Sequence, residues 1–207
     1  MTRFKLPAII AVLFSILFMV ALAATPITVD RELTTSLREW SAGEAVASDT
    51  DGILEAVTDD GTEQTVSTGF TKPPCPRNVT VTAGGTAGDI KAISVTVTGK
   101  RQGKTISEVI GPFTVDTAGT VAGTKAFDTV TEAVIPAHDG NGATTEIGFG
   151  ELLGLPYSSP YPVIIGAYKD GALDGSAALA VGATLELNTL DMNASLDGDP
   201  ISLIYLR

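Results

Sequence analysis

The alternation of side chains in residues 93–98 constrains the fold more than any other stretch of this chain. The residues read Ile-Ser-Val-Thr-Val-Thr, so aliphatic and hydroxyl-bearing side chains follow one another in turn. Because successive side chains of a β-strand point to opposite faces, the pattern predicts a half-buried strand. Ile93, Val95 and Val97 would form its buried face, and the hydroxyl-bearing residues, starting with Ser94, would form its exposed face.

A second arm follows after residues 100–103, which include a glycine. In residues 104–110 the alternation is less strict: Ile106 and Ile110 are spaced for one face, and Val109 falls on the other. A four-residue connection with glycine between two such arms predicts a β-hairpin.

Further strand candidates, separated by Gly/Pro turns, recur about every 8–12 residues, a spacing typical of sandwiches and barrels. They are residues 53–57, 77–82, 125–135, 144–150, 162–168, 178–190 and 201–206, with a weaker one in 113–123. Within 185–189, Leu185, Leu187 and Thr189 alternate against Glu186 and Asn188. We therefore predict an all-β fold, an antiparallel β-sandwich or barrel-like domain, preceded by an N-terminal apolar helix and a short lead-in segment.

Three parts are expected along the chain. In residues 1–23, Arg3 and Lys5 precede an uncharged run from Leu6 to Leu22, and a small-residue pattern ends at Ala23, which predicts a secretory signal peptide. An uncleaved membrane anchor stays open, because about 17 residues is the lower limit for spanning a bilayer.

Residues 24–70 form an acidic lead-in segment, and residues 71–207 form the main β domain, entered through a proline-rich stretch at 71–76. In the lead-in, Leu33, Leu37 and Trp40 have helical spacing, with Asp30 available as the N-cap. This predicts a short helix over residues 30–40.

Composition limits the possible functions. The formal net charge is -11, a sign that repels phosphate backbones, so nucleic-acid binding is not expected. Cys75 is the only cysteine, which excludes an intramolecular disulfide, and we expect a buried or partly buried thiol. An intermolecular disulfide or a reactive thiol are the alternatives. His138 is the only histidine, so any catalytic triad containing histidine would have to use it.

No residue is assigned to catalysis, to a cofactor or to a metal. The acidic residues Asp49, Asp51, Asp59 and Asp60 lack the ligand order of an EF-hand, so a solvated turn is expected there. Asp139 and Asn141 lie beside His138 in a loop, residues 136–142, whose Asp-Gly and Asn-Gly pairs are turn formers first.

Two other features concern the surface. Asn78-Val-Thr80 and Asn193-Ala-Ser195 match the glycan acceptor pattern. Residues 151–156 are expected to form a turn with exposed or docking leucines, Leu152, Leu153 and Leu155. The loops 99–103, 136–143 and 151–157 are the candidate contact sites.

An ordered set of strand and turn segments between Gly52 and Leu206 resembles small all-β virion structural proteins of tailed bacteriophages. The segments that carry the resemblance are residues 76–82, 95–99 with 103–108, 125–131, 148–150 with 154–157, and 188–193. The resemblance implies a capsid or decoration subunit of the virion that is not an enzyme. It would act through contacts with other subunits, including copies of itself.

Two alternatives remain from the sequence. The segment from Leu6 to Leu22 fits an exported or membrane-anchored cell-surface module, such as an adhesin or envelope-layer component. A hydrolase on a β-scaffold is the other alternative, but no Asp/Glu pair is singled out by spacing.

Overall fold

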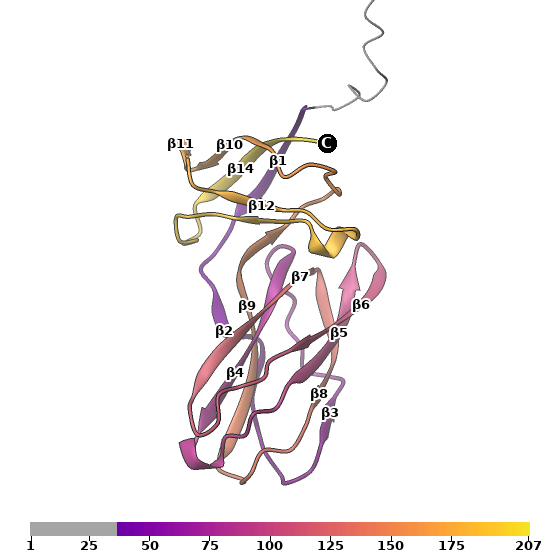
Figure 1. The fold of residues 1–207 in the computed structure, drawn as a ribbon, viewed down its shortest axis with the longest axis vertical. Coiled ribbons are helices and arrows are strands. Elements are labelled where there is room, and N and C mark those ends of the chain that lie inside the picture. Colours follow the sequence, from indigo (N-terminus) through magenta and orange to yellow (C-terminus); the bar gives the residue numbers. More distant parts are fainter. Residues whose placement is uncertain (1–36) are drawn as a thin grey trace, which may run out of the picture. The chain divides into compact units, whose positions relative to one another are not determined.

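The computed structural model describes residues 37–207, which form one compact unit (Figure 1). The predicted signal peptide or anchor of residues 1–23 lies outside the described residues, as do residues 24–36 of the lead-in. The helix predicted over residues 30–40 is wrong for residues 37–40, which belong to strand β1.

The described residues consist of short strands with two single-turn 3-10 helices. In chain order they are β1 (Leu37–Glu44), β2 (Asp49–Thr58), β3 (Gln64–Val66), β4 (Arg77–Gly85), η2 (Ala87–Asp89), β5 (Val95–Arg101), β6 (Lys104–Ile110), β7 (Gly119–Phe127), β8 (Thr129–Ile135), β9 (Ala143–Gly154), β10 (Ile164–Lys169), β11 (Ala172–Leu173), β12 (Ala178–Ala180), η3 (Leu185–Leu187), β13 (Thr189–Asp191) and β14 (Pro200–Leu206).

The strands form three sheets in which every pairing is antiparallel, and the sheets curl into a half-barrel. Sheet A has the order β1-β14-β10-β11. Sheet B has the order β12-β13-β9-β4-β7, with β2 also paired to β9, and sheet C has the order β3-β8-β5-β6. The predicted all-β class is confirmed.

The predicted hairpin is confirmed as β5 and β6, which pair from Val95 opposite Ile110 to Arg101 opposite Lys104. Its turn is shorter than expected, because only Gln102 and Gly103 separate the last pair. Both have positive φ, 47° and 79°, which is the backbone of a type I′ turn. The predicted faces are also confirmed: Val95 is fully buried, whereas Val109 is 67% exposed.

Two hydrophobic cores lie along strand β9, which is longer than the predicted strand 144–150. Sheets B and C enclose the first core, where β9 contributes Ile147 and Phe149. Sheet A, β12 and β13 enclose the second core, where the end of β9 and the residue after it contribute Leu153 and Leu155. Figure 1 shows β9 running from the first group of strands to the second.

This course of β9 overturns the expectation for residues 151–156. Residues 151–154 continue the strand rather than turning, and Leu153 and Leu155 are fully buried. They are core residues of the second cluster and cannot dock a partner. Leu152 is half-buried.

The strand candidate over residues 125–135, which is long enough to bend or bulge, is divided into two strands. Asp128 separates β7, which belongs to sheet B, from β8, which belongs to sheet C. Its carboxylate accepts hydrogen bonds from Arg101 and from the backbone N–H of Gln102, which fixes the break. The chain therefore crosses from one sheet to the other at this residue.

Residues 185–188 do not form the alternating strand that their pattern predicts. Leu185–Leu187 is a 3-10 helix, and Glu186 and Asn188 are buried while Leu185 and Leu187 are half-buried. The Asn188 amide donates to the carbonyls of Gly182 and Thr184 and accepts from the N–H of Ser159. These bonds satisfy backbone polar groups of the surrounding loops. The alternation pattern alone could not predict that role for Asn188.

The described part of the lead-in supplies a strand to each sheet. β1 pairs with β14, β2 with β9 and β3 with β8, so residues 37–66 are integral to the compact unit. The strand predicted at residues 53–57 is confirmed within β2. Trp40 pairs with Leu203 and packs on the second core, a long-range contact that outweighs the helical spacing.

The buried Tyr205 gives a first prediction. Its ring is fully buried in the second core, burial raises the pKa of its phenol, and its hydroxyl has no hydrogen-bond partner among the described residues. Because an unpaired buried hydroxyl costs about 1–3 kcal/mol, Tyr205→Phe is expected to stabilise the protein by about 1 kcal/mol. Chemical unfolding measures this, with Tyr168→Phe, a half-buried tyrosine of sheet A, as the control. A destabilised Tyr205→Phe variant would contradict the prediction.

Candidate contact surface

Sheet A has one face on the second core and one face that the described residues leave uncovered. On β14, the alternate residues Ile201, Leu203 and Tyr205 are fully buried, whereas Ile204 and Leu206 between them are only half-buried. Residues directly opposite each other on paired strands share a face. The strand register therefore identifies the other residues of the outer face.

The outer face is mainly apolar. Leu37 pairs with Leu206, and Tyr168 pairs with Leu173, so these residues lie on the same side as Ile204. Ile165 joins them at a bulge in β10. We call this set the apolar face: Leu37, Ile165, Tyr168, Leu173, Ile204 and Leu206.

Several members of the apolar face are open to solvent to an unusual degree. Leu37 is 63% exposed, Leu173 is 64% exposed and Ile165 is 56% exposed. Residues 162–168 have the composition of a buried strand, which predicts burial, and this prediction is wrong for Ile165. The bulge between Ile164 and Gly166 turns Ile164 to the core and leaves Ile165 outside.

Gly166 is part of this arrangement. A Cβ atom at this position would lie 2.7 Å from the ring of Tyr168, so that ring covers the glycine on the outer face. The tyrosine thus replaces the side chain that Gly166 lacks, as aromatic residues do across strands with glycine. The face is consequently continuous across β10.

The loop before β10 lies beside the end of β14. The N–H of Leu206 donates to the carbonyl of Val163 at 3.2 Å, which joins the loop to the end of β14. Val163, Tyr157 and Tyr161 are all exposed there. The guanidinium of Arg207 lies 4.4 Å from the centre of the Tyr157 ring, a cation–π contact at the border of the surface.

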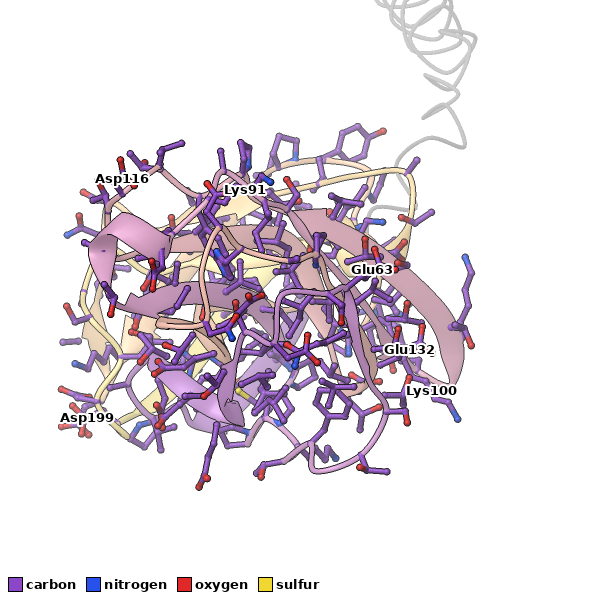
Figure 2. The ribbon with its side chains drawn as sticks, turned by 90° about the horizontal axis from the view of Figure 1, so that it is seen from below. Glu63, Lys91, Lys100, Asp116, Glu132 and Asp199 are labelled. Carbon is purple, nitrogen blue, oxygen red and sulfur yellow. The ribbon has the colours of Figure 1, made fainter. Side chains whose placement is uncertain are left out.

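Charged side chains are spread around the perimeter of the protein. Figure 2 shows Glu63, Lys91, Lys100, Asp116, Glu132 and Asp199 projecting outward. The first five lie on sheets B and C or on their connections, whereas Asp199 directly precedes β14 of sheet A and makes a 3.8 Å ion pair with Lys169 of β10. On sheet A, by contrast, the residues of β1 opposite Ser202, Ile204 and Leu206 include one charged residue, Glu39.

Two of the three predicted contact loops come together. Arg101, at the hairpin end, donates to the carbonyl of Leu155, and the Gln102 amide donates to the carbonyl of Pro156 at 2.8 Å. The loops 99–103 and 151–157 are therefore bonded to each other. Among their large apolar side chains, Tyr157 is the one left exposed.

The third loop, residues 136–143, is held by internal hydrogen bonds. The carboxylate of Asp89 accepts from the N–H of Gly142 at 2.9 Å, and Asp139 makes a 3.3 Å ion pair with Lys91. His138 is buried at its start, and its ring stacks on Phe113 with centroids 5.9 Å apart. Asp139 and Asn141 thus lie in a turn, as their Asp-Gly and Asn-Gly pairs predict.

His138 has a defined tautomer. Its Nδ1 accepts from the backbone N–H of Lys91 at 3.2 Å, so in the neutral ring Nε2 carries the proton. Nε2 lies 3.1 Å from the hydroxyl of Thr145 and donates to it. Burial lowers the pKa of His138, although the carboxylates of Asp59 and Asp139 partly oppose this.

This arrangement predicts acid sensitivity. The lowered pKa means that the unfolded chain binds a proton at His138 more readily than the folded chain, so its contribution to stability is complete above about pH 6.5. That contribution is lost as the pH falls through the folded pKa, because a protonated Nδ1 can no longer accept from Lys91. His138→Gln should therefore reduce the loss of stability between about pH 7 and pH 5 in urea unfolding. An unchanged pH profile in the variant would contradict this.

The first glycan acceptor match lies inside the protein. Asn78 is 2% exposed and sits at a bulge of β4. Its amide donates to the carbonyl of Gly123 at 2.9 Å, and its carbonyl oxygen accepts from the N–H of Leu152 at 2.9 Å. A glycan cannot be attached to this side chain in the folded protein, whereas Asn193 is exposed.

Cys75 is partly buried and packs on the second core, as expected from the sequence. Burial raises the pKa of its thiol, against the weaker effect of Arg77, which leaves it mostly protonated and weakly reactive. Within residues 37–207, no group of three or more His, Cys, Asp or Glu side chains is placed to hold a metal ion.

No protein-family model, no curated protein and no solved structure matches this chain. In the part of the chain that the structure describes, none of the helices has the length and apolar character needed to cross a bilayer.

Proposed function

We propose that this chain is a structural protein that works by binding other subunits, as a β-sandwich or barrel-like capsid or decoration subunit of a virion. The apolar face of sheet A is the observation that supports a contact function. Monomeric soluble proteins rarely expose contiguous apolar patches of several hundred Å², and such patches mark interaction surfaces. The virion assignment is supported by the resemblance of residues 52–206 to tailed-phage structural proteins.

The composition of this surface supports the same proposal. Interfaces between subunits are depleted in charge at their centre and enriched in aromatic residues. Opposite the outer residues of β14 from Ser202 to Leu206, β1 carries one carboxylate, that of Glu39, and the exposed Tyr157 and Tyr161 lie in the loop before β10. Together with Tyr168 these provide aromatic groups that can bury a large area.

Purified particles test this function directly. The protein should be found by mass spectrometry in particles whose genome encodes it, and a variant with Leu173→Glu on the apolar face should be incorporated less. Val109→Glu, on the exposed side of β6, is the matched control because it also places a carboxylate at an exposed aliphatic position. Absence of the wild-type protein from such particles would refute the virion role.

An exported or membrane-anchored surface module is the second candidate, and the run from Leu6 to Leu22 supports it. The N-terminal residue of the mature protein distinguishes the two. Ala24 at the N-terminus would show cleavage and export, whereas Met1 or Thr2 in a membrane fraction would show an anchor. An intact N-terminus in the cytosol would exclude this candidate.

A further inference from the structure

We infer that the first partner of the apolar face is a second copy of this chain, bound face to face as a two-fold symmetric pair. The inference rests on the proposed contact function and deepens it by naming the partner. It is carried by the sheet A register, which assembles Leu37, Ile165 and Leu173 on one surface that residues 37–207 leave uncovered.

Charge restricts where two copies can meet. Each copy has a formal net charge of -11, so acidic surfaces of two copies repel each other. Among the β1 residues opposite Ser202, Ile204 and Leu206, Glu39 is the one carboxylate. Two copies therefore approach at lower electrostatic cost through this face than through the charged perimeter of sheets B and C.

The apolar face is also chemically self-complementary. In a two-fold contact the same patch meets its own copy, so each group needs a complement within that patch. Aliphatic side chains such as Ile165, Leu173 and Leu37 meet this condition, because burying them leaves no donor or charge unpaired. A basic partner, by contrast, would need a group of carboxylates, and opposite Ser202, Ile204 and Leu206 the register places only that of Glu39.

The size of the surface fits a reversible pair. With strands about 4.8 Å apart and about 3.4 Å per residue, three seven-residue strands present about 340 Å² of face. The exposed parts of Tyr161 and Val163 bring this to about 500 Å² per copy, since aromatic residues contribute about 150–250 Å² when wholly exposed. A total of about 1,000 Å² is typical of weak, transient contacts, so association should depend on concentration.

Sedimentation of the full chain tests the pair with matched variants. Ile165→Glu should raise the dimer dissociation constant at least tenfold, because it would bury two carboxylates at the interface. Val109→Glu, at an equally exposed aliphatic residue on β6, should leave the constant unchanged. Residues 1–36 are the same in all variants, so association through them cannot produce a difference. Equal behaviour of the two variants would overturn the inference.

Cross-linking locates the contact. In a Cys75→Ala background, Ile165→Cys should form a covalent dimer on oxidation or with a bismaleimide, and Val109→Cys should not. Salt gives a further readout: higher ionic strength should strengthen the pair by screening the repulsion between acidic copies. Association that weakens with salt, or cross-linking at both positions alike, would overturn the inference.

Two outcomes separate this inference from the proposed function. Monomeric wild-type protein that is still incorporated into particles would refute the pair but leave the virion role intact. A pair that forms in solution, with the protein absent from particles, would refute only the virion role. Binding of the monomeric wild type, but not of Ile165→Glu, to phosphatidylcholine vesicles would assign the face to a lipid surface and overturn the inference.

Discussion

Gly148→Ala is expected to destabilise the fold by about 4 kcal/mol, among the largest effects of any single substitution. A Cβ atom at Gly148 would lie 1.9 Å from the carbonyl oxygen of Asp49 and 2.6 Å from the carbonyl carbon of Thr50. Both are backbone atoms of β2, so no side chain can rotate away to make room. The added methyl group must therefore push β2 off β9.

Gly119→Ala is the matched control for this substitution. Gly119 is also a strand residue of sheet B, but a Cβ atom there would meet nothing within 4 Å and its φ is not positive. Its replacement should be neutral or stabilising by up to about 1 kcal/mol, because alanine restricts the unfolded chain. Urea unfolding followed by circular dichroism compares the two. Similar stability of Gly148→Ala and wild type would show that β2 does not cross β9 this closely.

Local pattern was sufficient for the parts of the fold that depend on neighbouring residues. The β5–β6 hairpin follows from alternation at residues 93–98 and from the glycine at its turn. The crossing of β2 over Gly148 could not be predicted, since β2 and β9 lie far apart in the sequence. Nothing in the local pattern around a strand glycine shows which other strand passes over it.

The apolar face also could not be predicted from the sequence, because it too depends on strands that lie far apart in the chain. Residues 162–168 have the composition of a buried strand, and the bulge that exposes Ile165 arises from pairing with β14. The partner strand β1 comes from a segment with helical spacing, and it joins residues as distant as Ser41 and Ile201. The signal that could have indicated the face is the excess of large apolar residues in 161–165, which one buried face cannot accommodate.

Arg101→Ala is the second large prediction, with an expected loss of about 3–5 kcal/mol, as for other broken buried ion pairs. Arg101 is 4% exposed, and its guanidinium binds Asp128 and the carbonyl of Leu155. Asp128 lies between β7 and β8, which contribute Phe127 and Val130 to the first core, while Leu155 belongs to the second core. Truncation would leave both acceptors without this donor.

Two further variants, Arg101→Lys and Lys100→Ala, distinguish the effect of the positive charge of Arg101 from the effect of its donor geometry. Arg101→Lys should recover only part of the stability, because one ammonium group cannot reproduce the planar donor pair that reaches two acceptors. Lys100→Ala, at the exposed preceding residue of β5, should change stability by no more than about 0.5 kcal/mol. Chemical unfolding of the three variants gives the ranking. Full stability in Arg101→Lys would show that charge alone is sufficient.

Arg101→Ala should also uncouple the two cores, since the guanidinium joins one to the other. Trp40 is the only tryptophan and packs on the second core, so its fluorescence reports on that core, whereas far-UV circular dichroism reports on all strands. In the wild type the two signals should change at the same urea concentration, as in a two-state transition. In Arg101→Ala the Trp40 transition should come first, because the second core has fewer buried residues to stabilise it. Coincident transitions in the variant would show that β9 alone couples the cores.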